Sequence, residues 1–200
     1  NISPGPGNVV ARYTPADWER ALRHGVKPDG RPLMIMPSED YNRLSDADLG
    51  ALVAYVRQLP PAAGGAAELV LPLPLRVLYG LGQIPDAASI IDHQRKPPQP
   101  VAEGVSVEHG EYVSAMCIGC HGENLSGGKI PTGPPDWPVA PNLTPGEGSI
   151  MPRYPDAKAL ITMLRQGKRP DGTVITVMPF DSFKHITDTD VAALHLYLKS

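Results

Sequence analysis

The chain of 200 residues is long enough for one large domain or two small ones, and its formal net charge is -3. Without a basic stripe, nucleic acid is not an expected partner. With 24 prolines, 20 glycines and 6% aromatic residues, the chain needs a metal, a cofactor or disulfides to fill its interior. Two cysteines exclude disulfides as the main answer.

An internal repeat organises the sequence. Residues 25–58 align without a gap on residues 167–200, and 11 of the 34 positions are identical, including the "PDG" and "MP" segments. Upstream, "NISPGPG" at the start of the chain corresponds to "NLTPGEG" from residue 142. Met36 of the first copy is therefore the counterpart of Met178 in the second copy.

Residues 61–105 are predicted to be a proline-rich connector between the two copies. "LPPAAGGAA" from residue 59 is expected to be a flexible break, and "RKPPQPVAEG" from residue 95 a stiffer one. Between them, "LVLPLPLRVLYGLGQIP" is too short and too interrupted by proline to span a membrane. We expect this apolar piece to pack across the two domains, with a docking surface for a membrane subunit as the alternative.

The segment "CIGCH" contains both cysteines of the chain. On a helix, Cys117, Cys120 and His121 share one face, so two thiols can form thioethers to a haem while the imidazole reaches the iron. This spacing is the C-x-x-C-H signature of c-type haem attachment. A thioredoxin-like dithiol, half of a zinc site and a disulfide are the competing interpretations. The dithiol is disfavoured by the loop after the motif, and zinc by the lack of a nearby fourth ligand.

A haem iron in an electron carrier usually takes a second axial ligand, and a methionine thioether raises its potential. Met178 lies in a non-helical stretch 57 residues after His121, which is enough chain to reach the far face of a haem. Met163 lies in an apolar helical run and is predicted to be a core residue. His185 is the second candidate ligand, with a surface position as its simpler interpretation. The other histidines predicted to lie at the surface are His24, His93, His109 and His195.

Residues 106–200 resemble a class I cytochrome c domain, an all-α fold with few short helices around a covalently bound haem. The resemblance rests on the haem motif, on Gly110 before it and on the final helical stretch "TDTDVAALHLYLKS". In the family these two helices cross where a small residue meets an aromatic one, which implies Gly110 and Tyr197. The family also places a proline carbonyl against the proximal imidazole, which implies Pro141 of "APNLTPG".

The segments "NLTP", "LRQGKRPDG" and "MP" are similar to those of the dihaem and multihaem branch found in cytochrome subunits of bacterial membrane-bound alcohol dehydrogenases. This resemblance implies haem c as the cofactor. The implied site comprises Cys117 and Cys120 for attachment, His121 and Met178 for the iron, and Pro141 behind the imidazole. Weaker candidates, for contacts to the propionates, are Tyr154, Arg165 and Trp137; the alternative is a salt-bridged surface position for the arginine and ordinary core positions for the aromatic residues.

The repeat predicts two domains. Residues 1–60 are expected to be the C-terminal part of a first cytochrome c domain, and residues 106–200 a complete one. Met36 is then the iron ligand of a second haem in the intact protein. The attachment motif of that haem is expected about 25 residues before Asn1, from the spacing of motif and methionine in the second copy. A decayed copy with Met36 as a buried filler is the alternative.

The function implied is one-electron transfer between Fe(III) and Fe(II), without catalysis by the chain itself. The expected partners are redox proteins, with a dehydrogenase as electron donor and an oxidase or another cytochrome as acceptor. The chain is also a possible subunit of a membrane complex. Because haem c is attached outside the bacterial cytoplasm, the resemblance implies the periplasm or the periplasmic face of the inner membrane. A peroxidase-like haem enzyme or a haem-based sensor is the alternative. Either would need an open iron site, and the "VMPF" segment argues for a filled one.

Overall fold

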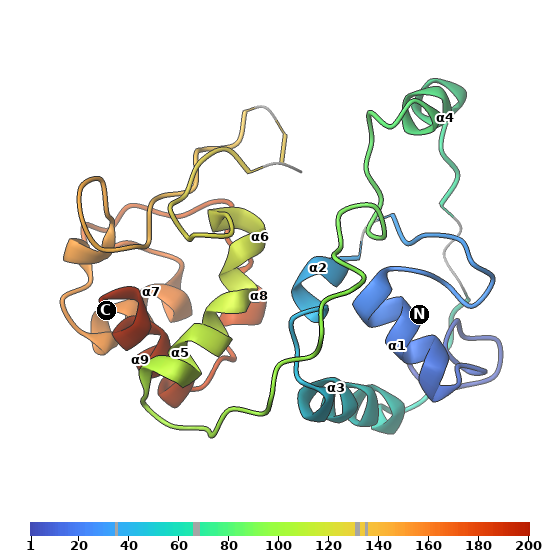
Figure 1. Ribbon diagram of the computed structural model, residues 1–200, viewed down its shortest axis with the longest axis horizontal. Coiled ribbons are helices and arrows are strands. Elements are labelled where there is room, and N and C mark those ends of the chain that lie inside the picture. The colour runs from blue at the N-terminus through green and yellow to red at the C-terminus, as the bar shows by residue number, and fades with distance from the viewer. Residues whose placement is uncertain (35, 66–68, 131–132, 135) are drawn as a thin grey trace. The chain divides into compact units, whose positions relative to one another are not determined.

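The computed structural model describes residues 1–34, 36–65, 69–130, 133–134 and 136–200, and it divides into unit 1 (Asn1–Pro100) and unit 2 (Val101–Ser200). In these described ranges every regular element is a short helix, and extended residues pair only in isolated bridges (Figure 1). The helices of unit 1 are α1 (Pro15–His24), α2 (Ser38–Tyr41), α3 (Asp46–Gln58) and α4 (Leu73–Gly80). Those of unit 2 are α5 (Val107–Ser114), η1 (Ala115–Cys117), α6 (Ile118–His121), η2 (Met151–Arg153), α7 (Ala157–Gln166), α8 (Phe180–Phe183) and α9 (Asp188–Leu198).

The local structure of unit 1 repeats that of unit 2 at a constant offset of 142 residues. Helices α1 and α7 both end at a glycine in the left-handed conformation, Gly25 (φ 63°) and Gly167 (φ 67°). An antiparallel bridge follows each glycine, and then α2 and α3 take the places of α8 and α9. The structural repeat therefore extends further towards the N-terminus than the sequence repeat. The sequence alignment does not include α1 and α7, because these two helices share few identical residues.

One arginine in each copy joins the first helix to the last. In unit 2, Arg165 of α7 donates to the Ile186 carbonyl and to the Asp188 carboxylate, with 2.9 Å between Nη2 and Oδ1. Arg23 of α1 makes the same two contacts with the residues 142 positions earlier, each over 2.8 Å. These charge-assisted hydrogen bonds fix the loop that leads into the last helix of each copy.

In unit 2, α5 crosses α9 through a glycine. A Cβ atom on Gly110 would lie 2.1 Å from the Ala193 carbonyl oxygen and 2.7 Å from Tyr197 Cβ, so this approach requires glycine. The predicted meeting of Gly110 and Tyr197 is confirmed. His109 adds a second link, because its Nε2 lies 2.7 Å from the Asp190 Oδ1 on α9.

The prediction of a surface position is wrong for two histidines. His109 is 7% exposed and His195 is 9% exposed. His195 Nε2–H donates to the Tyr154 carbonyl over 2.8 Å and so ties α9 to the loop before α7. Burial acts to raise the pKa of Asp190, but hydrogen bonds from Thr187 and His109 outweigh burial and lower it. The carboxylate beside His109 is therefore ionised at neutral pH.

Part of the connector packs on unit 1. Ala87 is 3% exposed, and its N–H donates to the Leu33 carbonyl over 2.8 Å. Ala62 N–H donates to Ser3 Oγ over 3.2 Å, which holds the first half of the expected flexible break against the N-terminal loop. The end of that break, residues 66 and 67, lies outside the described residues.

Helix α4 lies within the connector, and none of its residues is buried. The expectation that this apolar segment packs across the two domains stays a prediction. Among the described helices, α4 included, none has the length and apolar character needed to cross a membrane.

Two carboxylates of α2 each have one buried oxygen atom. Within the described part of the chain, neither Glu39 Oε2 nor Asp40 Oδ1 has a hydrogen-bond partner. Burial, with a smaller effect of the Glu39 charge, raises the pKa of Asp40 to about 6. The folded state then binds more protons than the unfolded state between pH 3.8 and about 6, so Asp40 destabilises the fold progressively as the pH rises through this window.

We expect Asp40→Asn to raise the free energy of unfolding at pH 7.5 by about 1 kcal/mol, because it removes the buried charge. This gain is smaller than the full pKa shift implies, since Asp40 is only half-buried and solvent screens its charge. At pH 4 the gain should be nearly absent, and urea unfolding at both pH values measures it.

The control is Asp181→Asn in α8. Asp181 is exposed, and a hydrogen bond from Lys184 lowers the pKa of its carboxyl. The control should not be stabilised at either pH. An equal gain in both variants would contradict the role assigned to Asp40.

Candidate haem site

The haem motif lies where a helix changes pitch. Helices α5, η1 and α6 follow one another without a break, and the chain tightens into a 3-10 turn that ends at Cys117. Cys120 and His121 complete α6, which stops at Gly122 with a φ of 81°. The helix expected over the motif is thus present, with a tighter turn at its first cysteine.

His121 is the buried residue of the motif, with 6% of its surface exposed. Its Nδ1–H donates to the Pro141 carbonyl over 2.9 Å. Because a carbonyl only accepts, this bond assigns the proton to Nδ1 and leaves the lone pair on Nε2. Burial lowers the pKa of His121, against a smaller opposite effect of Pro141, so the imidazole is neutral at pH 7. A neutral imidazole held from behind by a carbonyl is the form that binds a metal.

A tight loop holds the Pro141 carbonyl in place. Gly127 has a φ of 77°, and a Cβ atom there would lie 2.4 Å from the Ala140 carbonyl oxygen and 2.7 Å from that of Pro141. Gly128 and Ala140 exchange two backbone hydrogen bonds of 2.9 Å each. On the other side of Pro141, the side-chain oxygen of Asn142 accepts a hydrogen bond from the Thr144 N–H over 2.8 Å. Gly127 was not singled out from the sequence, where its only signal is a Gly-Gly pair after the motif.

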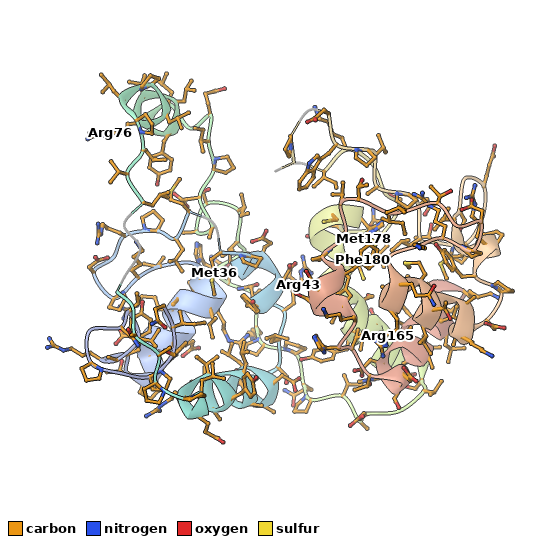
Figure 2. All side chains as sticks on the ribbon, turned by 180° about the vertical axis from the view of Figure 1, so that it is seen from behind. Met36, Arg43, Arg76, Arg165, Met178 and Phe180 are labelled. Carbon is orange, nitrogen blue, oxygen red and sulfur yellow. The ribbon has the colours of Figure 1, made fainter. Side chains whose placement is uncertain are left out.

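Cys117 and Met178 meet the same core in unit 2. Both side chains are partly buried and pack against the cluster of buried residues from α5, α7 and α9. Met178 lies just before α8, beside Phe180, whose ring covers Gly167 (Figure 2). Met163 of α7 belongs to the core itself at 7% exposed, as predicted.

The weaker candidates have contacts within the protein. Tyr154 is 3% exposed and its carbonyl accepts from a histidine of α9, while Arg165 is engaged by the contacts to α9 described above. Trp137 is 42% exposed. His185, the second candidate ligand, is exposed. These contacts give Tyr154 and Arg165 structural roles, and their approach to haem propionates stays a prediction.

The donor set fits haem c. Two thiols stand three residues apart, the adjacent imidazole presents Nε2, and a thioether lies in the same unit. In the described ranges, no group of three or more His, Cys, Asp or Glu side chains is arranged to hold a metal ion.

Comparison with known proteins supports the assignment of this site to haem c. Residues 107–200 match the sequence model of the cytochrome c family, so this half of the chain is a cytochrome c domain and its cofactor is haem c. A shorter match of 32% identity over 83 residues, 40% of this chain and 28% of the relative, is to a protein named diheme cytochrome c-type from Cereibacter sphaeroides. The recognition of a cytochrome c from the sequence is confirmed.

Three bacterial relatives align with the whole chain at 28% identity. They are the fructose dehydrogenase cytochrome subunit of Gluconobacter japonicus (43% of its length covered), the cytochrome c subunit of alcohol dehydrogenase (quinone) from Gluconobacter oxydans (46%) and the gluconate 2-dehydrogenase cytochrome c subunit of Pantoea cypripedii (50%). The chain spans about half the length of these relatives.

We expect Gly127→Ala to lower the free energy of unfolding by roughly 2–4 kcal/mol and to speed the solvent exchange of the His121 Nδ1 proton. The added Cβ would overlap the Ala140 carbonyl and push the Pro141 carbonyl away from the imidazole. Urea unfolding and proton NMR of the haem-loaded protein measure the two effects.

Gly128→Ala is the matched control for this change. Gly128 also has a positive φ, of 125°, but no atom lies within 4 Å of its Cβ position. The control should lose less stability and keep the slow proton. Equal effects in both variants would show that backbone strain alone is responsible.

Proposed function

We propose that the protein is an electron carrier whose second half is a class I cytochrome c domain. The observation that carries this proposal is the His121–Pro141 hydrogen bond beside the two cysteines, in a domain that matches the cytochrome c family. When bound, haem c supplies the Fe(III)/Fe(II) couple. Cys117 and Cys120 would hold it through thioethers, and His121 Nε2 and Met178 Sδ would ligate the iron.

The remaining residues orient these ligands and exclude water. Pro141 fixes the proton of His121 on Nδ1, which leaves Nε2 as the nitrogen that would ligate the iron. Met178 is partly buried against the core of unit 2, which would limit the access of water to its thioether. If His121 and Met178 both ligate the iron, no coordination site would be open to a substrate, and electron transfer is then favoured over a peroxidase-like enzyme or a gas sensor.

Carbon monoxide tests whether the iron is open. We expect the Soret band of the reduced haem-loaded protein to stay unchanged under carbon monoxide, because Met178 would ligate the iron. Met178→Ala should bind carbon monoxide at the haem of the second domain and shift the band of that haem. Met116→Ala is the control, since Met116 is next to the motif but 41% exposed. A shift in the unmodified protein would instead support the enzyme or the sensor.

We propose further that residues 1–60 are the C-terminal part of a first cytochrome c domain, followed by a connector over 61–105. The support is the match of helices, glycine caps and arginine contacts between the two units. Met36 packs against the core of unit 1 as Met178 does in unit 2. Tyr55 of α3 is 66% exposed, whereas its counterpart Tyr197 is covered by α5, which suggests that α3 pairs with a helix of the same kind.

The number of haems tests this domain proposal. We expect the mass of the intact protein to include two haem additions, and Met36→Ala to change the spectrum of one haem only. The matched variant Met178→Ala should change the other. A single haem, with a spectrum that Met36→Ala leaves unchanged, would show that the first copy has lost its cofactor.

We propose that the full-length protein receives electrons from a dehydrogenase and passes them to an oxidase or another cytochrome. The relatives are named as cytochrome subunits of fructose, alcohol (quinone) and gluconate 2-dehydrogenases. Because haem c is attached outside the bacterial cytoplasm, the proposed location is the periplasm or the periplasmic face of the inner membrane.

A further inference from the structure

The connector of unit 1 carries a row of exposed aliphatic side chains. Leu73, Val77 and Leu81 are 71%, 54% and 67% exposed. Their spacing of four residues places them along one face of α4 and its C-terminal end. Leu69 and Val70, just before the helix, are 53% and 75% exposed. We name these five residues the α4 patch.

The opposite side of α4 is fixed to unit 1. The Tyr79 hydroxyl donates to the Asp86 carboxylate, and Asp86 is held in a turn by the Ser89 N–H over 2.8 Å. Leu75, on the same side of the helix as Tyr79, is less exposed, at 39%. Figure 1 shows α4 at the tip of a loop of unit 1, away from α1, α2 and α3. The patch therefore has a defined outward direction.

The size and chemistry of the patch favour a lipid surface as its occupant. A helix of eight residues is about 12 Å long, and one face of it is much smaller than the roughly 800 Å² per partner that a stable protein interface buries. A bilayer needs no complementary shape and accepts aliphatic side chains to a depth of about 5–10 Å. Arg76 is the one charged residue between positions 69 and 83, and its cation suits lipid phosphates (Figure 2).

We propose that the α4 patch inserts into the surface of a phospholipid bilayer. The helix would lie in the plane of the membrane, with Leu73, Val77 and Leu81 among the acyl chains and Arg76 at the headgroups. This binding mode needs no membrane-spanning helix. It does not depend on the proposed electron transfer or on the number of haems.

Hydrogen exchange with mass spectrometry tests the proposal on the haem-loaded full-length protein. The probe is vesicles of phosphatidylethanolamine and phosphatidylglycerol. We expect the amides of residues 69–83 to exchange at least fivefold more slowly when vesicles are added. Because the readout is local, other membrane contacts of the protein do not hide the result.

The test variant replaces Leu73, Val77 and Leu81 by Gln, which keeps the helix propensity and removes the apolar row. It should lose the protection by vesicles. The control variant replaces Val105, Val139 and Val174 by Gln; these residues of unit 2 are 60%, 68% and 59% exposed. The control should keep the protection.

Three results would overturn the proposal. The first is no change on vesicle addition. The second is protection without vesicles that grows with protein concentration, which would assign the patch to a second copy of the chain. The third is protection that is present without vesicles at every protein concentration and is lost in the test variant. This result would assign the patch to packing within the protein.

Discussion

The hydrogen bond from His121 Nδ1 to the Pro141 carbonyl is the contact on which the site depends. It sets the proton of a buried imidazole and so decides which nitrogen can meet a metal. The bond exists because the loop after the motif turns back on itself at Gly127, where a side chain of any size would meet the backbone of 140 and 141. The protonation of the His121 imidazole therefore depends on Gly127, a residue that does not contact the ring through a side chain.

The rest of unit 2 serves to keep this loop and the Met178 segment around one core. Helix α5 carries the motif and is locked to α9 by the Gly110 crossing and by the His109–Asp190 pair. Helix α7 is tied to the start of α9 by Arg165. Each of the three longest helices of the unit is thus linked to another by a contact between residues far apart in the sequence. A loop-rich chain with few aromatic residues needs such contacts to form a defined core.

Residues that act through local spacing could be predicted from the sequence. The CxxCH motif and the core position of Met163 are visible within short segments. Pro141 was implied by the family resemblance, and the repeat by alignment of two segments of the chain. Among contacts over long separations, the meeting of Gly110 and Tyr197 was implied by the family resemblance, but contacts that the resemblance did not imply could not be predicted. His109 pairs 81 residues away and His195 pairs 41 residues away, so both looked like ordinary surface histidines. The equivalence of α1 and α7 was also hidden, because it is preserved in a glycine cap and an arginine rather than in general identity.

The closure of the Met178 loop has a consequence for its dynamics. The segment from Ile175 to Ile186 contains Met178 and is fastened at both ends to the C-terminal end of α7. Ile175 N–H donates to the Gly167 carbonyl, and Arg165 donates to the Ile186 carbonyl. A loop fastened at both ends opens as one cooperative unit. Displacement of the Met178 side chain would therefore accompany exposure of the backbone amides around it, and loss of the Arg165 contacts would make this opening easier.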